Sequence, residues 1–187
     1  LPYFYGEPFG SPFFFEFRIK NMKHLLTVLA VCAISQLLAQ ELPSTTLKTL
    51  DGQSINIKDA ISNEGPTVIS FWATWCKPCI KELTAFMDYA IDLEEEVGAK
   101  VLAVSIDDSR NSARVAPMAQ GQGWEYTILL DENQDLKRNL GIVNVPFTLV
   151  LNSEGKVVWK HSGYSPGDEE ELAEIVTEVA AGHSPSH

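Results

Sequence analysis

The chain has 187 residues, enough for one domain with a packed core. Of these, 45% are hydrophobic and 21% charged, as in an ordinary soluble globular protein. Asp and Glu number 25 against 14 Lys and Arg, so the formal net charge is -11. Binding of nucleic acid needs a basic stripe on the surface, and the sequence has none. We therefore expect no nucleic acid partner, and the charge favours neutral or cationic partners instead.

The first part of the sequence does not have the pattern of a folded domain. A short basic start at 22–24 precedes an apolar run over 25–39, as in a secretory signal peptide, whereas a membrane span needs about 20 apolar residues. We predict a signal peptide over 22–39, cleaved after its last residue, and export to the oxidising periplasm. Residues 1–21 lack an initiating Met and are interpreted as an upstream segment included by a mistaken start codon. An extended signal region is the alternative.

One of the three cysteines, Cys32, lies inside this apolar run. Attachment of a lipid to Cys32 would need a small residue just before it, and Val31 is not small. We therefore expect no lipid anchor. Removal of the signal peptide would leave Cys76 and Cys79 as the two cysteines of the mature chain.

The domain is predicted to begin with a hairpin over 46–57, where apolar residues alternate around an Asp-Gly turn. The run over 67–72 is almost wholly apolar, as in a buried central strand. A single long helix is then expected from Cys76 onwards, because apolar residues recur at helical spacing up to an acidic end. Gly98 would terminate this helix.

The remaining predicted elements are a strand over 99–106, a helix over 113–122 that Pro117 disfavours, a strand over 126–130, a helix over 134–140, an antiparallel hairpin of 147–151 with 157–159, and a helix over 168–181. The acidic first turn of the last helix suits the positive end of its dipole. This order predicts an α/β domain over 43–182, with a mixed sheet covered by helices on both faces, and a loose tail over 183–187.

The sequence Trp75-Cys76-Lys77-Pro78-Cys79 lies where the central strand gives way to the helix. Free backbone N–H groups and the dipole at a helix N-terminus stabilise an anion, here the thiolate of Cys76. Lys77 adds a positive charge, and Pro78 fits a first turn that needs no N–H donor there. We predict that Cys76 attacks a disulfide. Cys79, one turn further and more buried, would then resolve the mixed disulfide.

Two other interpretations of the cysteine pair are half a zinc site and a purely structural disulfide. Zinc needs two further ligands, but no cysteine follows Cys79, and His161, His183 and His187 are scattered. A structural disulfide that closes so small a ring would stabilise the fold little. We therefore expect reactivity of the pair, with no metal and no cofactor.

The segment FWATWCKPC over 71–79 resembles the active-site segment of the TlpA/ResA-like branch of the thioredoxin superfamily, and the resemblance covers about 46–181. It implies a thioredoxin-like three-layer sandwich, with a mixed central sheet, helices on both faces and an N-terminal β-hairpin extension. It also implies a monomeric thiol–disulfide oxidoreductase acting on protein thiols and disulfides. Such an enzyme would serve as a reductant recharged by a membrane thiol donor, for example during cytochrome c maturation.

The same resemblance assigns residues that bind substrate. A cis proline faces the dithiol in that branch, and Val145-Pro146 occupies its place here, so the backbone of Val145 would pair with an extended substrate segment. An ordinary proline at the start of a strand is the alternative. Trp75 is expected to be exposed and to contact the substrate, while Trp72 packs in the core.

Thioredoxin itself carries a buried Asp on the strand before the motif, which accepts the proton of the second cysteine, but Ser70 stands there in this chain. ResA-like reductases place an acid just after the next strand, and Asp108 matches that position best. Asp108 would then take the proton from Cys79 during resolution. The alternative for Asp108 is a solvated loop carboxylate that caps a turn.

Two further functions stay open. A peroxiredoxin-like peroxidase would carry its cysteine in a Pro-x-x-x-Thr-x-x-Cys context, which the chain lacks. A redox-inert binding or metal-carrying module on the same fold would retain metal and would fail to reduce disulfides.

Overall fold

The structure is a computed structural model that describes residues 41–185. The predicted upstream segment, the signal peptide and Cys32 lie outside the described residues. Within the described range, no helix combines the length and apolar character needed to cross a membrane.

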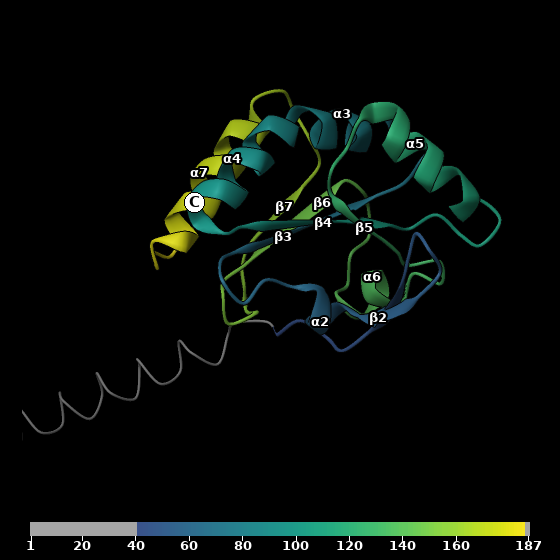
Figure 1. Cartoon of the computed structure of the whole chain (residues 1–187), viewed down its shortest axis with the longest axis horizontal. Helices are drawn as coiled ribbons and strands as arrows, with labels where there is room; N and C mark the ends of the chain where they lie inside the picture. The colour runs from purple at the N-terminus through teal and green to yellow at the C-terminus, as the bar shows by residue number, and fades with distance from the viewer. Residues whose placement is uncertain (1–40, 186–187) are drawn as a thin grey trace, which may run out of the picture. The chain divides into compact units, whose positions relative to one another are not determined.

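A seven-stranded mixed sheet forms the middle layer, in the order β2-β1-β5-β4-β3-β6-β7 (Figure 1). Its strands are β1 (Thr46–Thr49), β2 (Ser54–Asn56), β3 (Thr67–Trp72), β4 (Lys100–Ser105), β5 (Thr127–Leu130), β6 (Phe147–Leu151) and β7 (Val157–Ser162). The β3, β4 and β5 strands are mutually parallel, and β1, β2, β6 and β7 pair antiparallel to their neighbours.

Helices cover both faces of this sheet. They are α2 (Ile57–Ala60), α3 (Lys77–Ala85), α4 (Met87–Val97), α5 (Val115–Gln122), α6 (Asp135–Asn139) and α7 (Asp168–Ala180), with a 3-10 turn over Ser112–Arg114. Figure 1 shows α3, α4, α5 and α7 on one side of the sheet and α2 and α6 on the other. The predicted three-layer α/β sandwich is therefore confirmed.

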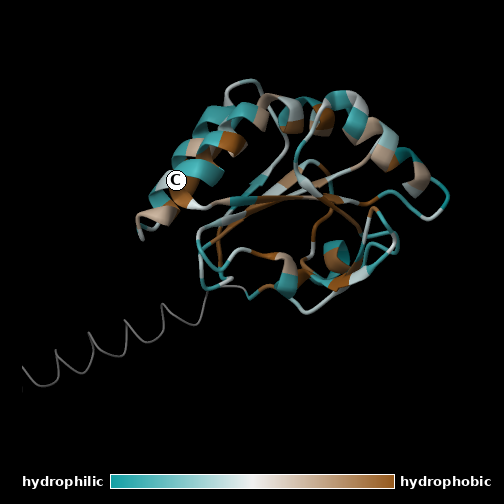
Figure 2. Ribbon diagram, in the orientation of Figure 1, coloured by the Kyte–Doolittle hydropathy of each residue, from teal (hydrophilic) through white to brown (hydrophobic). Residues whose placement is uncertain are grey.

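The central strand β3 is buried along its whole length because both of its faces are covered. Val68 packs in a cluster with residues of α4 and α7, while Ile69 and Phe71 belong to the larger cluster that includes Ile57. Figure 2 shows hydrophobic residues along the strands and polar residues on the outer sides of the helices.

The predicted N-terminal hairpin is confirmed as β1 and β2, and it extends the main sheet. Lys48 and Thr49 of β1 pair with Leu130 and Leu129 of β5. Pro117 lies inside α5, but within its first turn, where a backbone N–H has no helical partner and proline is tolerated. The short helix α2 was not predicted.

The prediction of one long helix after Cys76 is wrong in one respect, because the chain turns at Phe86 and forms α3 and α4 separately. The Leu83 carbonyl, close to this turn, accepts a 2.6 Å hydrogen bond from the Tyr126 hydroxyl. A side chain that bonds to the carbonyl ladder is a known cause of helix kinks. The turn also buries Phe86, which packs in the cluster with α7.

Strand register brings the functional segments together. Phe71, near the end of β3, pairs with Phe147 at the start of β6, and Trp72 pairs with Ser105 at the end of β4. The residues after β3, the loop before β6 and the residues after β4 therefore meet at one edge of the sheet.

Candidate active site

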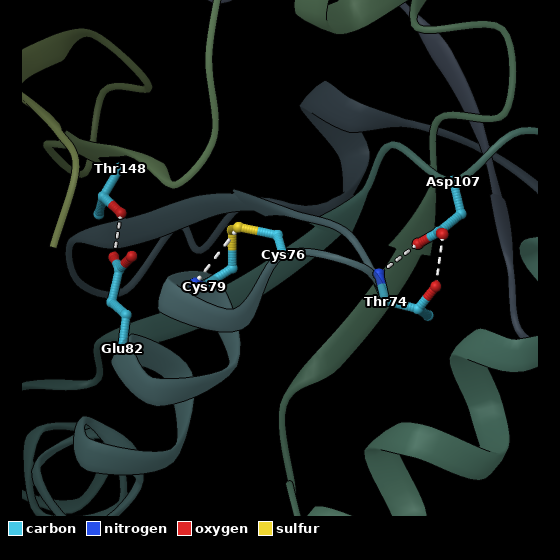
Figure 3. Close-up of a disulfide and its surroundings, with 6 residues drawn as sticks. All are labelled: Thr74, Cys76, Cys79, Glu82, Asp107 and Thr148. Atoms are coloured by element: carbon cyan, nitrogen blue, oxygen red, sulfur yellow. Dashed lines mark hydrogen bonds between the residues drawn. A yellow bond between two sulfur atoms is a disulfide. The ribbon is translucent and has the colours of Figure 1, made fainter.

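Cys76 and Cys79 form a disulfide at the start of α3, with their Cα atoms 5.3 Å apart (Figure 3). Cys76 is the N-cap residue, and its sulfur accepts a 3.4 Å hydrogen bond from the Cys79 N–H. Cys76 is 4% exposed and Cys79 is fully buried, so Cys79 is the more buried of the two, as predicted, by a small difference. An N–H donor directed at Cys76 stabilises its thiolate once the bond is reduced.

The residues beside the disulfide are arranged as the sequence predicts. Lys77 and Pro78 form the exposed first turn of α3. Trp75 is 65% exposed, whereas Trp72 is fully buried with its ring edge-on to Trp124 at 4.9 Å. Trp75 is thus available for contact with a partner, whereas Trp72 packs in the core cluster that contains both cysteines.

The peptide bond between Val145 and Pro146 is cis, which confirms the predicted conformation. The Pro146 carbonyl accepts a 2.9 Å hydrogen bond from the Gly163 N–H, which ties this loop to the segment after β7. Val145 remains half-buried against the core cluster that contains both cysteines.

Asp108 caps a turn. Its carboxylate accepts hydrogen bonds from the backbone N–H groups of Arg110 and Asn111 and from both of their side chains. Partial desolvation raises its pKa, but the hydrogen bonds from Arg110 and Asn111 outweigh this and hold the pKa below its usual value. These contacts match the alternative of a loop carboxylate, and a proton-accepting role for Asp108 stays a prediction.

The neighbouring Asp107 is the acid that points inward, and the sequence reasoning did not assign it a role. It is 1% exposed and accepts hydrogen bonds from the Thr74 N–H at 2.8 Å, the Thr74 hydroxyl at 2.6 Å and the Ser105 hydroxyl at 2.8 Å. Asp107 therefore fixes the segment that leads into Cys76 (Figure 3). An acid at the end of a strand parallel to β3 was the signal in the sequence.

A second buried acid, Glu82, was also missed. It lies on α3 three residues after Cys79, a spacing that places two side chains on the same helix face. Glu82 is 6% exposed, and its Oε1 accepts a 2.5 Å hydrogen bond from the Thr148 hydroxyl of β6. Its Oε2 is buried with no hydrogen-bond partner.

The pKa of Glu82 is raised to about 7. Burial is the main cause, the hydrogen bond from Thr148 opposes it, and the charge of Asp168 adds to it. A carboxyl group that gains and loses a proton near neutrality, one turn from the buried cysteine, is suited to proton exchange with a thiol.

Among residues 41–185, no group of three or more His, Cys, Asp or Glu side chains is arranged to hold a metal ion. His161 instead stacks on Trp159 and lies 3.3 Å from Asp168.

The fold, the helix-start disulfide and the neighbouring cis-proline loop define a thiol–disulfide oxidoreductase of the thioredoxin superfamily. The chain belongs to the AhpC/TSA family, whose model matches residues 38–160, and it is ResA-like within the superfamily.

Individual relatives agree with this assignment. The thiol-disulfide oxidoreductase ResA of Bacillus thuringiensis is 27% identical over 121 residues, which cover 65% of this chain and 67% of that protein. The sporulation thiol-disulfide oxidoreductase A of Bacillus subtilis is 29% identical over 113 residues, covering 59% and 66%. Among solved structures, an uncharacterized thioredoxin-like protein from Porphyromonas gingivalis is 38% identical with a TM-score of 0.68, covering 78% of this chain and 95% of that one.

Proposed function

We propose that this enzyme reduces protein disulfides in the periplasm, with Cys76 as the attacking and Cys79 as the resolving residue. The observation that carries the proposal is the bonded pair itself, in which the slightly exposed residue Cys76 lies at a helix N-terminus and the fully buried Cys79 lies in the first turn after it. The reductant direction and the membrane thiol donor are drawn from the resemblance to ResA-like reductases. Cytochrome c maturation is the pathway that this resemblance suggests.

The proposed reaction starts from the reduced enzyme. The Cys76 thiolate attacks a partner disulfide, the partner's S–S bond breaks, and one partner sulfur leaves as a thiolate that takes a proton from water. Cys79 gives its proton to Glu82 and attacks the Cys76 sulfur, which releases the second partner sulfur. The partner gains two electrons, and the enzyme ends with the Cys76–Cys79 disulfide. The membrane donor then returns two electrons to the enzyme.

The substrate segment is proposed to lie along Val145 and Pro146 and beside Trp75. The support is spatial, because the register of β3 with β6 brings this loop to the end of the strand that carries the motif. The exposed ring of Trp75 provides apolar contact next to Cys76. Lys77 and Pro78 are proposed to modulate the reactivity of the pair through charge and through the shape of the first turn.

The test of the cysteine roles uses two variants and a protein substrate that contains disulfides. Cys79→Ser should accumulate a covalent mixed disulfide through Cys76, visible on a non-reducing gel and reversed by a thiol. Cys76→Ser should accumulate none. Trapping through neither cysteine, or equal trapping through both, would contradict the assignment.

Direction, export and oligomeric state need separate measurements. The equilibrium of the pair with glutathione should give a low potential, and a potential like that of strong oxidants would overturn the reductant direction. Fractionation of cells that express the full chain should place the enzyme in the periplasm. Sedimentation should give a monomer, and rapid consumption of peroxide by the reduced enzyme would favour the peroxidase alternative instead.

A further inference from the structure

Two buried hydroxyl groups lie side by side in the sheet next to the redox site. Ser70 of β3 pairs directly with Thr148 of β6, and each residue is 2% exposed. Directly paired residues of antiparallel strands direct their side chains to the same face, about 5 Å apart at Cβ. The Thr148 hydroxyl is bonded to Glu82, so this face is the one that α3 covers.

Two of the four buried side-chain atoms without a hydrogen-bond partner in the described residues lie at this pair; the other two are Nε1 of Trp72, on the same face of β3, and Oε2 of Glu178 on α7. The Ser70 hydroxyl is buried without a hydrogen-bond partner, and so is the Oε2 atom of Glu82, while Oε1 of Glu82 is bonded to Thr148. An unpaired buried polar atom is costly and calls for an explanation in a native protein. The register therefore places the unpaired Ser70 donor beside Thr148, whose hydroxyl is bonded to the carboxylate that carries the unpaired Oε2 acceptor.

The titratable groups around Glu82 include acids, tyrosines and a histidine. They are Asp168 at the start of α7, Tyr164 in the preceding loop, Tyr126 before β5, Cys79 on the same helix, and His161 of β7, which pairs with Thr148 and whose Nε2 lies 3.3 Å from Asp168. The hydrogen bond that the Glu82 carboxyl accepts comes from a neutral donor, the Thr148 hydroxyl. On the same face, β3 carries two further neutral donors without partners, the Ser70 hydroxyl and Trp72 Nε1.

We propose that Ser70 and Thr148 are positioning residues that together hold the charged carboxylate of Glu82 beside Cys79. Thr148 donates to Oε1, and Ser70 turns its hydroxyl toward Oε2 when the carboxylate is charged. This rests on the proposed function, in which Glu82 takes the proton of Cys79. The strand position that carries an Asp in thioredoxin thus supplies a donor here, while the acid comes from α3.

The pair would act on the proton-transfer step through the charged form of Glu82. A carboxylate stabilised by two donors loses its proton at lower pH than one with a single donor. Glu82 must be charged before it can accept the proton of Cys79, so the rate of resolution should rise as pH increases through about 7. Removal of either hydroxyl should move this rise to higher pH.

The experiment measures resolution of a preformed mixed disulfide between Cys76 and a labelled peptide, from pH 5 to pH 9. In Ser70→Ala and in Thr148→Val, the midpoint should rise by about one pH unit, as expected for loss of one hydrogen bond to a charged group. The rate at pH 6.5 should then fall about three- to tenfold, while the rate at pH 9 changes little. Titration of the Glu82 carboxyl carbon by NMR in the oxidised enzyme should show the same rise without any turnover.

Two further variants separate this role from packing. Thr148→Ser restores a hydroxyl and should bring the midpoint back toward that of the unmodified enzyme. Thr67→Val removes a buried hydroxyl on the opposite face of β3 and should leave the midpoint in place.

The outcomes distinguish the two proposals. Unchanged NMR and kinetic midpoints in Ser70→Ala and Thr148→Val would overturn the role of the hydroxyl pair, and so would an equal loss of rate at every pH. If the unmodified enzyme resolves the mixed disulfide with no midpoint near neutrality, the proton-accepting role of Glu82 fails. The NMR titration would still decide whether the pair holds its carboxylate.

Discussion

Two buried carboxylates flank the disulfide, and they differ in how they are satisfied. Asp107 receives three hydrogen bonds from Thr74 and Ser105, whereas Glu82 receives one from Thr148 and keeps an unpaired oxygen. A fully bonded carboxylate is a fixed anchor. One that lacks donors is held near its neutral form and exchanges a proton easily. A carboxylate therefore holds the loop on one side of the disulfide, at Asp107, and is suited to proton transfer on the other side, at Glu82.

The strongest test of this contrast is Glu82→Gln, which keeps the size of the side chain and removes the proton acceptor. We expect the resolution step at pH 7.5 to slow by about 100-fold, within the range for loss of a general base. Stopped-flow measurement of mixed-disulfide decay checks it. Glu95→Gln, an exposed position on α4, provides the control for loss of charge. Equal rates in Glu82→Gln and the control would remove Glu82 from the mechanism.

The pH dependence of stability sharpens the contrast. Burial raises the pKa of Glu82 from 4.5 to about 7 in the folded state, so above pH 4.5 the unfolded chain releases a proton that the folded chain retains. This contribution to stability therefore falls as pH rises from about 4.5 to 7, by about 3 kcal/mol in all. In urea unfolding, the free energy of unfolding of Glu82→Gln should increase relative to that of the unmodified enzyme as the pH rises from about 4.5 to 7. If the free energies of unfolding of the two proteins differed by the same amount at every pH, the prediction would be contradicted.

For Asp107, substitution is expected to lower the stability of the fold, whereas substitution of Glu82 raises it. Asp107→Asn replaces an acceptor oxygen with an NH2 group that faces the donors of Thr74 or Ser105. We expect a loss of about 2 kcal/mol in the free energy of unfolding, measured in urea at pH 7. The resolution rate should keep its pH midpoint, because Asp107 holds the loop and does not take the proton. A shifted midpoint would give Asp107 a part in proton transfer.

The smallest expected effect belongs to Asp108. Its carboxylate caps an exposed turn, so Asp108→Asn should change stability by less than about 0.5 kcal/mol. The resolution rate should stay within about twofold in the same mixed-disulfide assay. A large loss of rate in this variant would instead assign the proton-accepting role to Asp108, as the sequence predicted.

Local pattern was sufficient to predict much of the fold. The apolar run over 67–72 and the periodic helices gave elements whose bounds agree closely with β3 and α7, and the motif placed Cys76 at the start of α3. The turn at Phe86 was not predictable in this way, because the hydroxyl that bonds to the nearby Leu83 carbonyl belongs to Tyr126, 43 residues after Leu83.

The two missed acids show the limit more clearly. Periodicity identifies a helix face by its apolar residues, so an acid on that face, such as Glu82, goes unnoticed until its partner Thr148 is known. Asp107 and Asp108 are adjacent, and only the direction of the chain after β4 decides which one points inward. Both cases depend on contacts between segments distant in sequence, which a local pattern does not contain.

The two outermost strands of the sheet also affect whether the enzyme pairs with extended segments of other proteins. One outer strand of the sheet is β2, only three residues long, and the other is β7, which ends in the hydrophilic residues Lys160, His161 and Ser162. Edge strands that are short or that carry charged side chains disfavour pairing with extended segments of other chains. An oxidoreductase that acts on extended segments of other proteins is thereby protected from pairing with them along the outer strands of its sheet.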